Sequence, residues 1–297
     1  MNTIFQHKSV LTREVLEYLN PQPGKIYVDC TFGGGGHTRA ILEKEPECTV
    51  IGIDWDLDTL KLTAPEIQEE FGDRFLRVMG NFGNLERLLK RIGVDKVDGI
   101  LADFGTSQYQ IKEKAGFSFS SDTLLDMRMS TGHYKVWAAD IVNNATEKEL
   151  AHIFYTYGEE RHGAKIARAI VEERKIKKFR TTRDLAELIE KLLGRKPGTI
   201  HPATRVFQAL RIVVNDELGN IHSLLQQVPR LLHEGGRLVC ISFHSLEDRM
   251  VKQYMKESPY FKILTNKVIT AQEDELEANP SSRSAKLRAA EKIAESI

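Results

Sequence analysis

The stretch that decides the fold reads Tyr27-Val28-Asp29-Cys30-Thr31-Phe32-Gly33-Gly34-Gly35-Gly36-His37. An apolar run ends in an acid, four glycines follow, and the segment from Thr38 to Lys44 can form a helix. This order is typical of the first strand, loop and helix of a nucleotide-binding βα unit. Glycines permit positive φ angles and let the backbone approach a ligand, and the N–H groups that open a helix can bind a polar group.

The spacing of the glycines separates two classes of ligand. A dinucleotide loop follows the pattern Gly-x-Gly-x-x-Gly, and neither Gly33 nor Gly34 begins such a series. The next apolar run ends in Asp54, which is placed to hold the ribose diol of either NAD or S-adenosylmethionine. The missing third glycine favours S-adenosylmethionine, and so does the extra acid Asp29, where a methionine ammonium could bind.

The composition describes a globular protein without a membrane segment. The 297 residues are 41% hydrophobic and 28% charged, which suits one large or two modest domains. No apolar run reaches the roughly 18–20 residues of a membrane span, and residues 1–8 lack the apolar centre of a signal peptide. Basic and acidic residues number 42 each, so net charge indicates no partner. We therefore expect a cytoplasmic protein.

The three cysteines, Cys30, Cys48 and Cys240, lie far apart and are odd in number. Their spacing matches neither a disulfide framework nor a zinc site, and the sequence shows no other protein metal site. Cys30 and Cys240 lie in strand-like apolar runs, so we expect both to be buried.

Strand and helix signals alternate in the first part of the chain. Strands are expected at the run from Tyr27 and at 49–54, 75–79 and 97–103, with helices at 15–19, 38–44, 55–71 and 84–92. Such alternation predicts an α/β fold with a parallel, doubly wound sheet. From about residue 108 to 200 the strand signals stop, and helices are expected at 138–141, 146–155, 164–173 and 182–193.

Alternation returns after Pro202. Helices are expected at 203–215, 218–232 and 246–256, a strand at 237–243 and a closing strand pair at 261–264 and 267–269. Residues 281–288 read as a polar, basic tail. We predict three segments: the first part of an α/β core at 1–110, a helical insertion at 111–200, and the second part of the core, with the basic tail, at 201–297.

Many motifs together carry a resemblance to a known family. They are Thr31-Phe32-Gly33-Gly34-Gly35-Gly36-His37, Asp103-Phe104-Gly105-Thr106-Ser107, Gly116-Phe117-Ser118-Phe119, Leu125-Asp126-Met127-Arg128-Met129, Tyr157-Gly158-Glu159-Glu160-Arg161, His201-Pro202-Ala203-Thr204-Arg205, Phe207-Gln208-Ala209-Leu210-Arg211, Ser242-Phe243-His244-Ser245-Leu246-Glu247-Asp248-Arg249 and Arg283-Ser284-Ala285-Lys286-Leu287-Arg288. In this order they resemble the bacterial 16S rRNA cytosine-N(4) methyltransferase family RsmH, formerly MraW, over nearly the whole length.

The resemblance implies a class I, Rossmann-like methyltransferase core with an inserted helical domain and S-adenosylmethionine as cofactor. It implies cofactor contacts by Gly33, Gly35, Gly36, His37, Asp54, Phe82, Asp103 and Gln110. Asp54 would accept both ribose hydroxyls, and Phe82 would cover the adenine or wall its slot. The implied substrate is a cytidine in the decoding region of 16S rRNA, so the expected partner is the small ribosomal subunit. Naked rRNA and a homodimer are left open.

Two departures from the family lie on the presumed substrate side. Gln108 replaces a second serine after Ser107, and Thr123-Leu124 replace the Gly-Pro that usually precedes the Leu-Asp-Met-Arg motif. They bear on substrate geometry more than on cofactor binding.

The turn that follows the fourth strand supplies the catalytic candidates, Asp103 and Ser107. The amino nitrogen of cytosine is a poor nucleophile, because its lone pair is delocalised into the ring. An acceptor for its N–H hydrogens would leave the lone pair directed at the methyl group. Asp103 lies at the edge where open α/β sheets bind ligands, so we expect it to orient the amino group and take its proton. The plainer alternative is that Asp103 only caps the turn.

A basic run is the main candidate for RNA contact. The expected RNA-binding residues are Arg174, Lys175, Lys177, Lys178, Phe179, Arg180 and, at the start of a later helix, Arg205. The cations can neutralise phosphates and Phe179 can stack on an unpaired base. The alternative is a solvated helix end, whose cations favour the helix dipole.

Rival functions make different predictions. Methylation of DNA or a small amine would not need the basic run, and DNA enzymes of this type use a proline-rich turn that is absent after Asp103. A binding protein without catalysis would bind S-adenosylmethionine but transfer nothing. The glycine spacing makes a NAD oxidoreductase the weakest alternative.

Overall fold

The computed structural model describes residues 9–105, 114–119, 121–195 and 198–294. The chain divides into two compact units. Met1–Ser107 together with Leu218–Ile297 form the first, here the core unit, and Gln108–Glu217 form the second, here the insertion unit. Each unit is described by itself.

A seven-stranded sheet forms the centre of the core unit, with the strand order β3-β2-β1-β4-β5-β7-β6. The strands are β1 (Ile26–Asp29), β2 (Thr49–Asp54), β3 (Phe75–Met79), β4 (Val97–Asp103), β5 (Leu232–Ser242), β6 (Phe261–Ile263) and β7 (Lys286–Lys292). The first five run parallel, and β7 is antiparallel to both of its neighbours. The strand order reverses between β1 and β4, which is where open α/β sheets form a ligand crevice.

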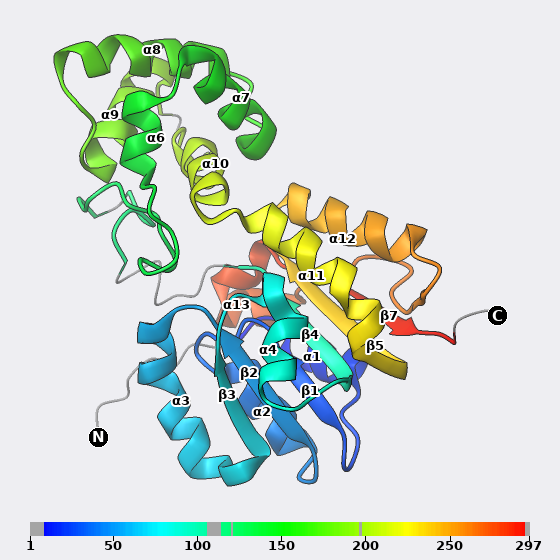
Figure 1. Ribbon diagram of the computed structural model, residues 1–297. Coiled ribbons are helices and arrows are strands. Elements are labelled where there is room, and N and C mark those ends of the chain that lie inside the picture. Colours follow the sequence, from blue (N-terminus) through cyan, green and yellow to red (C-terminus); the bar gives the residue numbers. More distant parts are fainter. Residues whose placement is uncertain (1–8, 106–113, 120, 196–197, 295–297) are drawn as a thin grey trace. The chain divides into compact units, whose positions relative to one another are not determined.

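Helices cover both faces of this sheet (Figure 1). One face packs on α1 (Thr12–Leu19), α2 (Gly36–Lys44) and α3 (Leu57–Phe71), and the other on α4 (Leu85–Arg91), α11 (Glu217–Leu231) and α12 (Ser245–Glu257). Consecutive strand residues divide between the two cores, as the alternation of side chains requires: Val50 faces the first and Ile51 the second. The α/β, mainly parallel, doubly wound fold is therefore confirmed.

The predicted end of the sheet is wrong. The segment at 267–269 was expected to pair with 261–264, but β6 pairs with β7, and Ile269 makes only an isolated bridge to Leu287. The expected basic tail contains β7, whose Leu287, Ala289 and Ala290 are buried. Charged residues between these apolar ones made the strand hard to find in the sequence, and one of them pairs with a helix: Arg288 donates two hydrogen bonds to Asp248 on α12.

The insertion unit is helical, as predicted. Its helices are α6 (Ala138–Asn144), α7 (Glu147–Gly158), α8 (Gly163–Ile176), α9 (Thr182–Leu193) and α10 (Thr204–Asn215), and they share one apolar core. The boundary expected after residue 200 falls instead after Glu217. The reason is α10, since its apolar side chains, among them Val206, Phe207 and Leu210, pack in the insertion core and not in the sheet. The first boundary falls after Ser107, close to the expected residue 110.

The described chain also contains α13 (Glu273–Ala278) and three 3-10 turns, at Gly72–Arg74, Phe82–Asn84 and Pro280–Ser284. A search of the described helices for one both long and apolar enough to cross a membrane found none. Cys30, Cys48 and Cys240 are buried free thiols, so the expected burial of the first and last is confirmed.

Candidate active site

One aromatic side chain, Phe32, packs against the glycine loop after β1. Phe32 is buried and its ring stacks on Phe75 at a centroid distance of 5.2 Å. Gly35 has a φ of 75°, and a Cβ there would lie 3.0 Å from the Phe32 ring. Gly52 on β2 is equally constrained, because its Cβ would lie 2.7 Å from the same ring. Glycine is therefore required at Gly35 by the backbone angle and at both positions by close packing.

Asp54 connects the loop to the end of β2. Its carboxylate accepts hydrogen bonds from the backbone N–H of Gly33 at 2.8 Å and of Asp56 at 2.9 Å. Burial raises the pKa of Asp54 to about 7, and the two N–H groups oppose this rise. The acid thus stands beside the loop at the position predicted for the ribose.

Asp29 has a different role from the one expected. It is completely buried, and its oxygens accept hydrogen bonds from the Thr31 N–H at 3.2 Å and the Thr38 hydroxyl at 2.8 Å. Burial raises its pKa. An ammonium group would need an accessible oxygen, so the predicted contact of Asp29 with a methionine ammonium is wrong. Asp29 fastens the loop to the first turn of α2.

Asp103 ends β4 beside the loop. Its backbone N–H donates to the Thr31 hydroxyl at 2.8 Å, and its side chain is 20% exposed. One carboxylate oxygen lies 3.6 Å from Nε2 of His37, in the first turn of α2. His37 is 5% exposed, and neither ring nitrogen has a hydrogen-bond partner among the described residues. An acid and a buried imidazole thus face each other where the strand order reverses.

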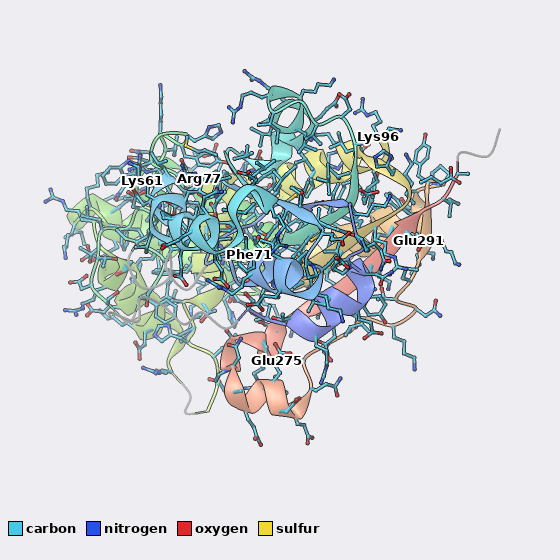
Figure 2. All side chains as sticks on the ribbon, turned by 90° about the horizontal axis from the view of Figure 1, so that it is seen from below. Lys61, Phe71, Arg77, Lys96, Glu275 and Glu291 are labelled. Carbon is cyan, nitrogen blue, oxygen red and sulfur yellow. The ribbon has the colours of Figure 1, made fainter. Side chains whose placement is uncertain are left out.

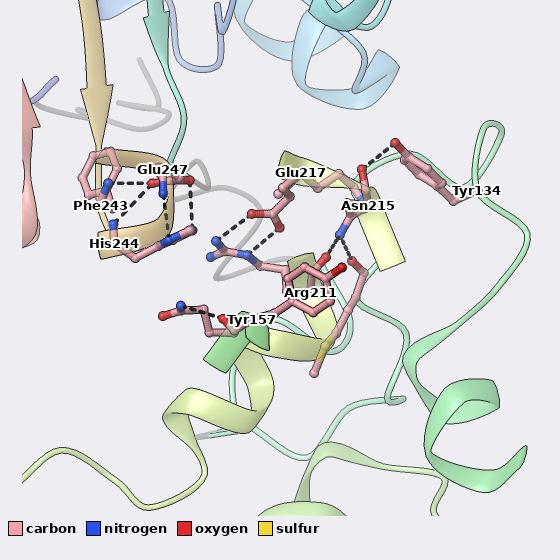
Figure 3. Close-up of polar contacts among 11 residues, drawn as sticks. Tyr134, Tyr157, Arg211, Asn215, Glu217, Phe243, His244 and Glu247 are labelled. Carbon is pink, nitrogen blue, oxygen red and sulfur yellow. Dashed lines mark hydrogen bonds and ion pairs between the residues drawn. The ribbon is translucent and has the colours of Figure 1, made fainter. Parts of the chain in front are cut away.

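The turn that carries Asp103 is covered by the end of β5. A Cβ on Gly105 would lie 2.6 Å from the Phe243 ring, so only glycine fits there. The carboxylate of Glu247 accepts hydrogen bonds from the backbone N–H groups of Phe243 and His244, at 2.8 and 3.3 Å (Figure 3). Nε2 of His244 lies 3.1 Å from the other Glu247 oxygen. His244 therefore opens α12 as a cap.

Phe82 lies between two further aromatic rings. It follows β3, and its ring centroid is 6.4 Å from that of Trp55 and 6.0 Å from that of Phe104. The buried Asn81 braces the turn: its Oδ1 accepts from the Gly83 N–H, and its Nδ2 donates to Asn220 on α11. The sequence reading missed Trp55 and Asn81, although each adjoins a residue that it named.

These residues fit a cofactor with a nucleoside at one end and an amino acid at the other. Asp54 offers acceptors for a diol, and the Phe82 ring offers a flat apolar wall. The unpartnered ring nitrogens of the buried His37 offer a polar contact beside the loop. Gly36 opens α2, whose first N–H groups can meet a carboxylate. Ser107 and Gln110, which were also predicted for the site, lie outside the described residues, as does Gln108.

Part of the basic run is engaged within the insertion unit. The Arg174 guanidinium donates to the carbonyl oxygens of Val142 and Ala145, where α6 ends. Lys175 pairs with Glu172 and Lys177 with Asp184, while Lys178 and Arg180 have exposed side chains without an ion pair among the described residues.

The prediction that Phe179 stacks on RNA is wrong. The side chain is 3% exposed and belongs to the insertion core. Its backbone is held by the amide of Asn143, which accepts from the Phe179 N–H and donates to its carbonyl oxygen. An aromatic inside a basic run is ambiguous in sequence, since apolar anchoring and base stacking need the same residue type. Arg205 is exposed and donates to the carbonyl oxygen of Glu159, just after α7.

A buried amide that the sequence reading missed organises the loop before α6. The Asn215 side chain accepts from the Met129 N–H at 2.7 Å and donates to the carbonyl oxygens of Met127 and Arg211 (Figure 3). The hydroxyl of Tyr134 donates to the carbonyl oxygen of Asn215. Thr123, one of the family departures, is also held by backbone contacts: its hydroxyl accepts from Gly116 N–H, and its N–H donates to the Thr182 hydroxyl.

Comparison with known proteins identifies the family. The model of the MraW methylase family matches residues 4–293. A relative from Nostoc punctiforme is 49% identical over 97% of this chain and 95% of its own length, and one from Carboxydothermus hydrogenoformans is 45% identical over 97% and 98%. Both are named ribosomal RNA small subunit methyltransferase H. The resemblance and the Rossmann-like class I methyltransferase fold that it implied are confirmed, and this chain belongs to the MraW methylase family.

Proposed function

We propose that this protein transfers a methyl group from S-adenosylmethionine to the exocyclic amino nitrogen of a cytidine in the decoding region of 16S rRNA. The observation that carries the proposal is the meeting of Asp103, His37 and the glycine loop at the reversal point of the sheet. The names of the relatives support a small-subunit rRNA substrate.

The cofactor would be held by residues of the core unit. Asp54 would accept the ribose hydroxyls, the Phe82 ring would wall the adenine, and the loop from Gly33 to Gly36 with His37 would meet the methionine end. Bound there, S-adenosylmethionine supplies a methyl group on a positively charged sulfur. The loop is already fastened to Asp29 and Asp54, so it pays little ordering entropy on binding.

Asp103 would act on the nucleophile. Its partly exposed carboxylate would accept an N–H of the cytosine amino group, so that the nitrogen lone pair is directed away from the ring and in line with the methyl group. After transfer the nitrogen carries an excess proton, which Asp103 is placed to accept. Carbonyl oxygens of Phe104 and Gly105 are further acceptors in the same turn. Ser107 follows that turn, and we retain it as a catalytic candidate.

The substrate would be rRNA within the small ribosomal subunit, in the cytoplasm. The exposed cations Lys178, Arg180 and Arg205 of the insertion unit would contact phosphates. Such contacts position the protein along the RNA but do not recognise its base sequence. Lys175 and Lys177 can exchange their carboxylate partners for phosphate, whereas Arg174 stabilises the end of α6.

The test uses small subunits from cells that lack this protein. They are incubated with the enzyme and labelled S-adenosylmethionine, and nucleosides from the digested rRNA are identified by mass spectrometry. New N(4)-methylcytidine is expected, and naked rRNA assayed in parallel defines the substrate. No label in RNA from an enzyme that binds the cofactor would reject the proposal in favour of a DNA or small-amine substrate. Light scattering on the purified enzyme alone measures its molar mass and so reports whether a homodimer forms.

A further inference from the structure

A polar groove lies between α4 and α11 of the core unit, outside the residues proposed for cofactor and catalysis. These two helices belong to the same face of the sheet (Figure 1). The groove has a volume of about 570 Å³, within the range of natural ligand sites. It begins at Gly83, the residue after Phe82.

One glutamine, Gln227, links the two walls of the groove. The Gln227 side chain donates to the carbonyl oxygens of Gly83 and Ser223, both at 2.7 Å, and accepts from the Glu86 N–H at 2.8 Å. These bonds link the two helices, so the shape exists before anything binds. Gly83 is required at the end of the groove, because a Cβ there would lie 2.7 Å from Oδ1 of Asn220.

The α4 wall carries positive charge. Lys90 donates a hydrogen bond to Glu86 at 2.8 Å. Glu86 is the one acidic residue among those that line the groove, so its charge is already paired. Arg87 is exposed and has neither an ion pair nor a hydrogen bond among the described residues. A guanidinium binds a phosphate through two parallel hydrogen bonds, so Arg87 is the natural phosphate contact of this wall.

The α11 wall carries neutral hydrogen-bonding groups. His222, Ser223 and Gln226 are exposed and line the groove with an imidazole, a hydroxyl and an amide. Such groups suit ribose hydroxyls and base edges. No large apolar side chain lines the groove, so it lacks the buried anchor on which protein partners usually depend.

We propose that this groove binds the sugar-phosphate backbone of the rRNA segment that flanks the target cytidine, with Arg87 on a phosphate and Gln226 on the opposite wall. The proposal rests on the proposed function for its choice of RNA, and it deepens that function by adding a contact surface of the core unit to the cations of the insertion unit.

The test compares Arg87→Gln with Lys61→Gln. Lys61 is an exposed cation of α3, outside the groove, so its loss changes net charge equally (Figure 2). We expect Arg87→Gln to weaken binding of small subunits about three- to tenfold, and to reduce the slope of log K against log salt by about 1. Gln226→Ala should weaken binding without changing the slope. The Kd of S-adenosylmethionine should be unchanged in all three variants.

Equal effects of Arg87→Gln and Lys61→Gln, or no effect of Arg87→Gln, would overturn the proposal. Binding of a nucleoside monophosphate that depends on Arg87, with subunit affinity unchanged in Arg87→Gln, would assign the groove to a small anion and also overturn the proposal. Affinity is measured without turnover, so the outcome is separable from the proposed reaction. An enzyme that forms no N(4)-methylcytidine but shows the lower salt slope would reject the reaction and support the groove.

Discussion

The surroundings of the Asp54 carboxyl group change the acidity of this candidate binding residue. Burial raises its pKa to about 7, above the ordinary value of 3.8 for an aspartate. A raised acid pKa stabilises the fold most below the unfolded pKa, and this contribution is lost as pH rises through about 7. In the proposed role of Asp54 the ionised form accepts the two ribose hydroxyls, so ionisation for binding lowers the stability of the fold.

We therefore expect cofactor affinity to depend on pH. As pH falls below about 7, the Kd of S-adenosylmethionine should rise, by at most about tenfold per pH unit, because the acceptor becomes protonated. Calorimetric titration between about pH 5.5 and about pH 8.5 measures this. Asp54→Asn should bind more weakly and lose the dependence. A variant that kept the same slope would assign the titration to another group, such as Asp29.

For Asp103 we expect a loss of rate. Asp103→Asn keeps the size of the side chain but removes the proton acceptor, so the single-turnover rate at saturating cofactor should fall about 10²- to 10⁴-fold. Measuring at saturation separates this loss from weakened binding, in which Asp103 also has a predicted part. Full turnover in the variant would show that the charge of Asp103 has no role in the reaction.

At the scale of elements, the sequence predicts best where local pattern and final packing agree. The strands from β1 to β4 are short apolar runs that end in acids or glycines, and they form as expected. The strand β7 could not be found this way, because its burial depends on β5 and β6 arriving on either side. Helix α10 was found, but its apolar stripe does not reveal which core it enters.

The loop after β1 gives a prediction at this scale. Gly35→Ala should lower the midpoint of thermal unfolding and abolish cofactor binding, since the backbone is left-handed and the new methyl group meets Phe32 and Ile67. The matched control is Gly24→Ala, where φ is 69° but nothing lies within 4 Å of the added Cβ. The control should cost about 1–2 kcal/mol and leave binding intact. Equal losses would show that backbone strain alone limits the loop.

At the scale of the whole molecule, the candidate site could be predicted only as far as its residues follow single strands. The positions of Asp54, Phe82 and Asp103 come from strand ends, and sequence order places them at one sheet edge. The misreading of Asp29 and Phe179 has another cause, because burial is decided by neighbours distant in sequence. The two units each have a core of their own, in line with the expected helical insertion between two parts of an α/β core.

This division predicts where the cofactor will act. At about 100 times its Kd, S-adenosylmethionine should stabilise the structure that binds it by about 2.7 kcal/mol. Hydrogen exchange should slow in β1, α2 and β2, and change little in α8 and α9 of the insertion unit. Mass spectrometry of peptides with and without cofactor measures this. Equal protection of α8 and α9 would contradict a site confined to the core unit.

The place of β7 between β5 and β6 also has a consequence during synthesis. Both β5 and β6 leave the ribosome before β7, the strand that lies between them in the sheet. Likewise β4 is made before its neighbour β5, and the whole insertion unit is synthesised between the two. Nascent chains therefore carry an unpaired edge of β4, and then of β5, for as long as translation at about 5–20 residues per second requires. The core unit is expected to close late, after the insertion unit has had time to fold.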